Sequence, residues 1–99
     1  MYTEIKSFAF LGDKKMYVVF EDGKKGRFDM SKYVVSDYFS AFQNETYFRR
    51  AFLEYGVITW PNGQDISPDT VAVELVPCDL PEGAELIREN RHHHTELLP

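Results

Sequence analysis

The stretch Gly56-Val57-Ile58-Thr59-Trp60-Pro61-Asn62-Gly63-Gln64-Asp65-Ile66-Ser67-Pro68-Asp69 carries the strongest fold signals in the 99-residue chain. It begins with a glycine typical of a helix end, followed by a short apolar strand that reaches Trp60. The proline that follows fixes φ at the second position of a tight turn, and Gly63 closes that turn. Ser67-Pro68-Asp69 then predicts the start of a short helix, which we expect to end before Pro77.

Residues 44–55, immediately before this stretch, predict a helix. Asn44 is a suitable N-cap, because its side-chain oxygen can accept hydrogen bonds from the first free backbone amides. Apolar side chains then recur at helical spacing and form one stripe that we expect to pack in the core: Tyr47, Phe48, Ala51, Phe52 and Tyr55.

The N-terminal third predicts a three-stranded antiparallel meander over residues 3–11, 15–21 and 24–30. Residues 12–14 form the first turn. For the second turn, a three-residue loop over residues 21–23 pairs Met16 with Phe28 and Val18 with Gly26, whereas a two-residue loop would place apolar side chains beside charges. We therefore predict the three-residue loop, with one face of the sheet apolar: Phe8, Phe10, Met16, Val18, Phe20, Phe28 and Met30.

The opposite face of this meander carries Tyr17, Val19, Lys25, Arg27 and Asp29. One interpretation makes Tyr17 and Arg27, with Arg49 and Arg50 farther along the chain, a candidate binding surface. The plainer one is a solvated face with a single cross-strand pair, as antiparallel sheets commonly have.

The remaining segments have weaker signals. Residues 33–35 could extend a strand, and residues 36–42 resemble an irregular or single-turn helical connection. After residue 77, prolines and a glycine interrupt the pattern and apolar density falls. We therefore predict a single domain over residues 1–77 and a polar tail over residues 78–99 that is mobile unless a partner orders it.

Composition restricts the class of protein. A chain of this length forms one domain, and its 43% apolar content argues against disorder. The net charge of −5 argues against a primary role on nucleic acid. The single cysteine, Cys78, fits a reducing compartment, and neither a signal peptide nor a membrane-spanning stretch is visible. A cytoplasmic location is expected.

Candidate catalytic chemistry has simpler explanations. His92-His93-His94 could chelate a metal, but it lies on the predicted tail without converging ligands, so no metal site is expected. Asp22, Asp65 and Asp69 could supply paired carboxylates, yet each has a role in a turn or cap. Since a phosphate-binding glycine loop and a nucleophile elbow are also missing, we expect no enzyme activity and no cofactor.

Basic residues form two small groups: Arg49 and Arg50 on the predicted helix, and Lys24, Lys25 and Arg27 on the hairpin. In an acidic protein such groups are more often solvated faces than a phosphate footprint. Direct nucleic-acid binding is therefore not expected.

Trp60, Asn62, Gly63 and Asp65 make the candidate binding loop. Tryptophan is enriched at protein interfaces, and loop asparagine and aspartate offer polar recognition. The alternative is that Trp60 fills the core while the other three residues shape the turn.

The hairpin Val18-Val19-Phe20-Glu21-Asp22-Gly23, Phe48 and residues 56–69 together resemble DUF2442, a bacterial family of small domains of unknown function. The resemblance covers about residues 3–75, and its Trp-Pro-Asn-Gly-x-Asp-Ile-x-Pro-Asp segment is quite specific. It implies a small two-layer α+β domain with an antiparallel sheet packed on a helix, and it brings no catalytic residues. Some family members are similar in context to toxin–antitoxin or other regulatory operons, and some carry an added helix-turn-helix domain that has no counterpart here.

The sequence thus predicts a non-enzymatic cytoplasmic module that contacts an unknown protein partner or a second copy of itself, in a regulatory or antitoxin-like role. The alternative is a regulator associated with a small ligand or nucleic acid, acting through the loop from Trp60 to Asp65.

Overall fold

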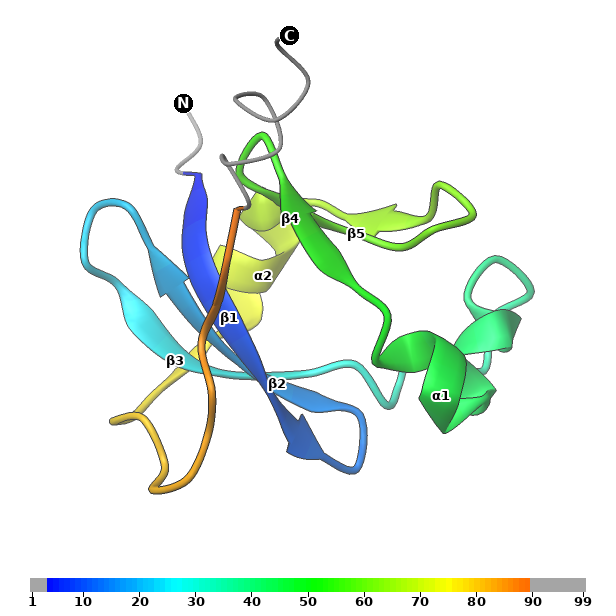
Figure 1. Cartoon of the computed structure of the whole chain (residues 1–99), viewed down its shortest axis with the longest axis horizontal. Helices are drawn as coiled ribbons and strands as arrows, with labels where there is room; N and C mark the ends of the chain where they lie inside the picture. The colour runs from blue at the N-terminus through cyan, green and yellow to red at the C-terminus, as the bar shows by residue number, and fades with distance from the viewer. Residues whose placement is uncertain (1–3, 90–99) are drawn as a thin grey trace, which may run out of the picture.

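Two antiparallel sheets and the short helices beside them enclose the core in the computed structural model, which describes residues 4–89 (Figure 1). The larger sheet has five strands in the order β7-β3-β2-β1-β8, and the smaller one has the order β4-β5-β6. The chain therefore forms an α+β domain, as predicted. In chain order the elements are β1 (Ile5–Gly12), β2 (Lys15–Phe20), β3 (Lys25–Asp29), the 3₁₀ helix η1 (Ser40–Gln43), α1 (Glu45–Phe48), β4 (Phe52–Glu54), β5 (Val57–Thr59), β6 (Asp65–Ile66), α2 (Pro68–Glu74), β7 (Val76–Pro77) and β8 (Ile87–Arg88).

The predicted meander and its register are confirmed. Met16 lies opposite Phe28 and Val18 opposite Gly26 in the β2–β3 ladder, which is the pairing of the three-residue loop. Gly23 has φ of +97° and donates its N–H to the Phe20 carbonyl at 2.9 Å, as the bulged turn requires. The first turn is shorter than predicted, because β1 continues to Gly12 and the turn consists of residues 13–14.

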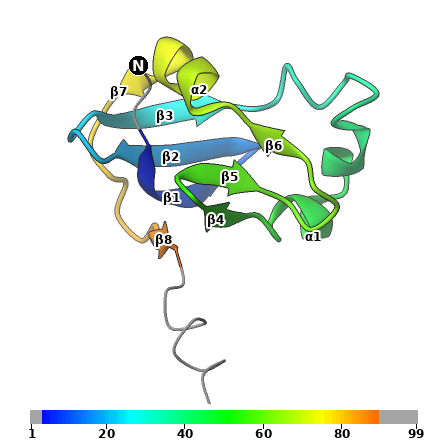
Figure 2. The same ribbon diagram turned by 90° about the horizontal axis from the view of Figure 1, so that it is seen from above.

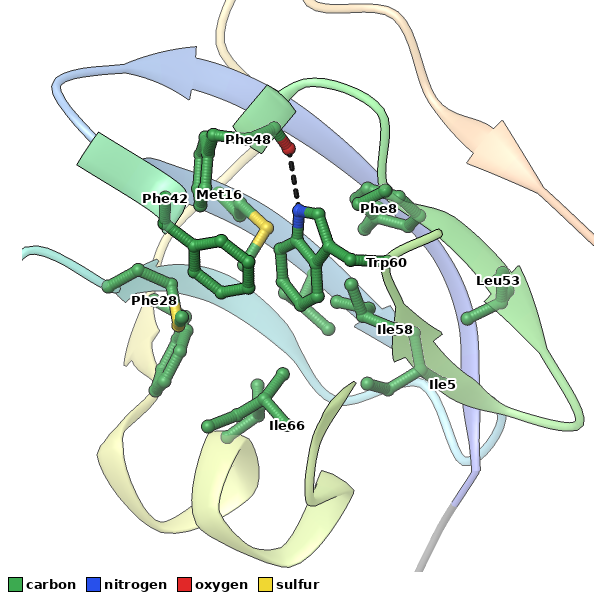
Figure 3. Close-up of a cluster of buried hydrophobic side chains, with 14 of the residues drawn as sticks. Ile5, Phe8, Met16, Phe28, Phe42, Phe48, Leu53, Ile58, Trp60 and Ile66 are labelled. Atoms are coloured by element: carbon green, nitrogen blue, oxygen red, sulfur yellow. Dashed lines mark hydrogen bonds between the residues drawn. The ribbon is translucent and has the colours of Figure 1, made fainter. Parts of the chain in front are cut away.

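The apolar face of the meander packs against the inner face of β4–β6 and against α2 (Figure 3). Its predicted residues are buried, apart from Phe10, which is half-buried. Leu53, Ile58 and Ile66 point inward from the smaller sheet. The aromatic content therefore serves mainly to fill one core. The largest fully buried side chains in this core are Trp60, Phe8, Phe20, Phe28, Phe42 and Phe48, and Tyr17 is fully buried on the other face of the meander.

The predicted helix over residues 44–55 is wrong beyond its first turn. Asn44 does cap α1 by accepting a hydrogen bond from the Tyr47 N–H, but α1 ends at Phe48. The chain then forms a hairpin, β4–β5, whose two-residue turn is Tyr55-Gly56 with φ of +52° and +78°. Gly56 therefore belongs to a hairpin turn and does not end a helix. Its carbonyl accepts the Ile5 N–H at 3.0 Å, which joins the two sheets.

Helix α2 begins and ends where the sequence predicts. The Ser67 hydroxyl accepts the Asp69 N–H at 3.2 Å, Pro68 occupies the first turn, and the helix ends at Glu74 before Pro77. The connection over residues 31–43 is irregular and contains η1, so the strand considered for residues 33–35 does not form. No helix within residues 4–89 has the length and apolar character needed to cross a membrane.

The segment after α2 differs from the predicted tail. β7 pairs with β3 and β8 pairs with β1, so residues 78–86 connect the two edges of the larger sheet. Figure 1 shows this crossing segment passing in front of the meander, on the side opposite α2. The sheet thus extends to Arg88, beyond the domain end predicted at residue 77. Residues 90–99, with His92–His94, lie outside the described part.

Candidate functional site

Trp60 is a core residue. Its side chain is 0% exposed, its ring centroid lies 4.2 Å from that of Phe42, and its indole Nε1–H donates to the Phe48 carbonyl at 2.8 Å (Figure 3). This carbonyl lies at the C-terminal end of α1, where carbonyls lack intrahelical partners. The interpretation of Trp60 as a core residue is therefore confirmed, and its interpretation as an exposed contact residue is wrong.

The turn after Trp60 is a three-residue hairpin loop, Pro61 to Gly63. The Trp60 N–H donates to the Gln64 carbonyl at 2.8 Å, and the Gly63 N–H donates to the Trp60 carbonyl at 2.9 Å. Gly63 has φ of +94°, a backbone conformation that favours glycine. This is the same hydrogen-bond pattern as in the β2–β3 turn.

Tyr47 on α1 holds this loop from outside the hairpin. Its hydroxyl accepts the Asn62 N–H at 2.9 Å and donates to the Gln64 side-chain Oε1 at 2.6 Å. Within residues 4–89, the Asn62 amide group and the Asp65 carboxylate have no recorded hydrogen-bond partner, and both residues are exposed. The loop therefore presents free polar groups on a fixed backbone.

We expect Tyr47→Phe to destabilise the protein by about 1–2 kcal/mol, because one hydroxyl makes two hydrogen bonds and the ring itself is retained. Amide hydrogen exchange at Asn62 should accelerate more than exchange in β2. Urea unfolding and exchange measurements would check both effects. Tyr38→Phe is the control, since the Tyr38 hydroxyl has no hydrogen-bond partner within residues 4–89. Equal effects of the two substitutions would contradict the assigned role.

The outer side of the smaller sheet is a candidate contact surface, which we call the open face: Phe52, Glu54, Val57, Thr59 and Asp65. Cross-strand pairing places Phe52 opposite Thr59, Glu54 opposite Val57, and Thr59 opposite Asp65. In Figure 2, β4–β6 lie in front of β1 and β2, and no other described strand or helix crosses in front of β5.

Aromatic side chains are exposed on and beside the open face. Phe52 is 39% exposed on β4, and Tyr55 is 74% exposed at the tip of the β4–β5 hairpin. The opposite end of the sheet carries the loop with Asn62 and Gly63. The smaller sheet thus carries three of the four predicted loop residues at one end, and Phe52 and Tyr55, which were predicted on a buried helix stripe, along β4 and at its other end. The sequence feature that could have revealed their exposure is Tyr55-Gly56 between two short apolar runs, which fits a two-residue hairpin turn.

The second predicted surface, Tyr17 and Arg27 with Arg49 and Arg50, is not one continuous surface in the structure. Tyr17 and Arg27 are cross-strand neighbours, but Tyr17 is only 1% exposed. Its hydroxyl donates to the Cys78 carbonyl of the crossing segment at 3.0 Å, and burial raises the pKa of this phenol. The expected solvated face is therefore wrong at Tyr17, because the crossing segment covers it.

The predicted surface residues Arg49 and Arg50 follow α1, at the other end of the molecule from the β2–β3 hairpin (Figure 1). Arg49 Nε donates to Glu45 at 2.6 Å, and its guanidinium lies 5.5 Å from the centre of the Phe10 ring. Arg50 is exposed. These two arginines do not share a site with Arg27 in the described structure.

Arg27 lines a shallow hollow of about 350 Å³ together with Lys15, Asp29, Lys32, Glu74 and Val76. Hydrogen bonds from Ser31 lower the pKa of Asp29, and hydrogen bonds from Tyr33 and Lys32 lower the pKa of Glu74. Both carboxylates are thus held ionised by neighbours. The same hydrogen bonds to Glu74 raise the pKa values of Lys32 and Tyr33. Both basic and acidic side chains therefore line this hollow, and its carboxylates are already paired with neighbouring residues.

These features define a small α+β domain of two antiparallel sheets, with a buried tryptophan and one sheet face open to solvent. The chain belongs to the family described as "Protein of unknown function (DUF2442)", whose sequence profile matches residues 5–75. A search of curated proteins and a search of solved structures each found no match. The family resemblance drawn from the sequence is confirmed.

Proposed function

We propose that this domain is a non-enzymatic cytoplasmic module that binds a protein partner through the open face. The observation that carries the proposal is the exposure of Phe52 on the open face and of Tyr55 at the adjoining hairpin tip. No other described strand or helix crosses in front of β5 (Figure 2). Buried anchors at protein interfaces are enriched in aromatic residues, and a hairpin tip can insert such a residue into a partner's pocket. A regulatory or antitoxin-like partner is the narrower form of the proposal, and it comes from the family resemblance.

No recognisable catalytic group is found among residues 4–89, which supports a binding role. All three histidines lie at positions 92–94, outside the described residues, so residues 4–89 contain no histidine that could activate a serine or cysteine. Among residues 4–89, no three His, Cys, Asp or Glu side chains group as metal ligands would. Local hydrogen bonds and ion pairs account for the lowered pKa values of three carboxylates, Asp29, Glu45 and Glu74.

Tyr55→Ser is expected to reduce partner binding at least tenfold while leaving the fold intact, because Tyr55 is largely exposed in the free protein. The measurement is co-purification of a genomic-neighbour protein with the tagged chain from native cells, followed by titration of the two purified proteins. Tyr38→Ser is the matched control, since Tyr38 is 57% exposed but lies on the connection before η1.

The outcomes separate clearly. Loss of binding with Tyr55→Ser alone supports the open face. Equal binding by both variants would contradict the open face as the contact surface. A chain that remains monomeric and recovers no partner would contradict the interaction module itself.

The alternative, a regulator that binds a small ligand or nucleic acid through the loop from Trp60 to Asp65, has only the free Asn62 and Asp65 groups in its favour. The buried indole of Trp60 offers no surface for stacking a base. A thermal-shift screen tests it, because a ligand at a hundred times its Kd should stabilise the protein by ~2.7 kcal/mol.

A further inference from the structure

Charge is divided along the chain. Residues 51–87 contain seven carboxylates and not one lysine or arginine, so all eleven basic residues lie outside this segment. The segment comprises the whole smaller sheet, α2 and the crossing segment. The open face is therefore built entirely from the acidic part of the chain.

Two of these carboxylates, Glu54 and Asp65, belong to the open face itself. The ion pairs recorded within residues 4–89 involve Glu45, Glu74 and Asp79, and none involves Glu54 or Asp65. An exposed carboxylate is favourably hydrated in the free protein, and a cationic side chain from a partner can pair with it at the interface.

The spacing of the two carboxylates follows from the strand register. Glu54 lies opposite Val57 and Asp65 opposite Thr59, on the two strands that flank β5. Strands lie about 4.8 Å apart and rise about 3.4 Å per residue, which puts the Cα atoms of Glu54 and Asp65 roughly 12 Å apart on a diagonal. Val57 and Thr59 lie between them, next to the half-exposed Phe52.

We infer that the partner presents to the open face an extended segment in which two basic side chains, four residues apart, flank an aliphatic one. In a strand, residues i and i+4 lie about 13 Å apart on one side, with residue i+2 between them. The basic side chains then pair with Glu54 and Asp65, and the aliphatic side chain packs on Val57 and Phe52. This inference rests on the proposed function and adds the chemistry of the partner.

The first test uses two peptides of matched apolar content and opposite charge, acetyl-Gly-Arg-Thr-Ile-Thr-Arg-Gly-amide and the same peptide with glutamate in place of both arginines. Each is titrated into the ¹⁵N-labelled full chain. The basic peptide is expected to shift amide signals of β4, β5 and Asp65 in a saturable way that weakens with added salt, since exposed charge pairs are screened. Equal shifts by the acidic peptide, shifts elsewhere in the molecule, or no saturable shift at the open face would overturn the inference.

The second test removes charge while keeping shape. Glu54→Gln combined with Asp65→Asn should weaken binding of the basic peptide at least fivefold. Glu82→Gln combined with Glu85→Gln removes the same charge from the crossing segment and should leave the affinity within twofold. Equal losses in the two double variants would mean that overall charge, and not the open face, attracts the peptide, and would overturn the inference.

Binding of the protein partner by these variants shows whether the inference fails alone or together with the proposed function. Suppose that Tyr55→Ser abolishes partner binding but Glu54→Gln with Asp65→Asn does not weaken it. The proposed contact surface then stands, and the inference that the partner segment is basic is wrong. If neither variant affects partner binding, the proposed contact surface fails as well.

Discussion

Replacing Trp60 by alanine is expected to destabilise the protein by about 3–5 kcal/mol, the range measured when large buried aromatic residues are truncated. The indole is fully buried and packs against Phe42 and Phe48. Its removal leaves a cavity and also leaves the Phe48 carbonyl at the end of α1 without its partner. Since domains of this size are stable by only about 5–15 kcal/mol, this variant should lie close to global unfolding at 37 °C.

The measurement is urea unfolding followed by far-ultraviolet circular dichroism. Trp60 is the only tryptophan, so the variants lack the tryptophan fluorescence that would otherwise report unfolding. Trp60→Phe is the informative partner variant: it keeps a ring in the cavity but loses the N–H donor, so it should cost clearly less than alanine. A loss below about 1 kcal/mol for Trp60→Ala, which is the range of surface substitutions, would contradict the central position of this side chain. Equal losses for alanine and phenylalanine would assign the effect to the hydrogen bond alone.

Side-chain parity made the meander predictable from the sequence. A strand alternates its faces with a period of two, so a shift of one residue in the β2–β3 turn would have placed charges opposite Phe20 and Val18. Local turn chemistry likewise located α2, because Ser67 and Pro68 satisfy the requirements of a helix start without reference to the rest of the fold.

The helix predicted over residues 44–55 failed because tertiary structure decided between two patterns that the sequence permits. Its apolar stripe fits a helix, but Phe52-Leu53-Glu54 also alternates with Leu53 inward. The strand conformation gives Leu53 a place beside Ile58 in the core and lets the Gly56 carbonyl pair with Ile5. These contacts are distant in sequence, so local propensity could not reveal them.

The crossing segment was missed for a related reason. β7 and β8 are two residues long, too short for periodicity to appear, and they form only where edges of an existing sheet are available. The residues of the candidate site likewise divide into those with a local sequence signal and those that depend on the tertiary structure. Asn62, Gly63 and Asp65 were found through turn chemistry, whereas Phe52 and Tyr55 could be recognised as surface residues only after the β4–β5 hairpin was known.

The second large expected effect arises from Gly26 in β3, which lies against β7 immediately before the crossing segment. A Cβ atom at this position would lie 2.3 Å from the Val76 carbonyl oxygen and 2.9 Å from the Pro77 Cα, both backbone atoms. Real Cβ contacts of this length essentially do not occur, so in Gly26→Ala β7 must move away from β3. We expect a loss of about 2–3 kcal/mol, in the range of overpacked cores.

A local consequence distinguishes this displacement from a general loss of stability. The crossing segment begins at Cys78, the only cysteine, whose carbonyl accepts the hydrogen bond from Tyr17. If β7 separates from β3, the half-buried Cys78 thiol should become accessible, and its alkylation by iodoacetamide under native conditions should accelerate at least fivefold.

Gly63→Ala is the matched control for Gly26→Ala. Its φ of +94° makes alanine strained by about 1–2 kcal/mol, but nothing lies within 4 Å of the added methyl group. It should therefore lower the free energy of unfolding without changing the alkylation rate of Cys78. If Gly26→Ala leaves that rate at the wild-type value, β7 and the crossing segment do not depend on the close approach at Gly26. An equal acceleration in both variants would instead attribute the reactivity of Cys78 to global unfolding.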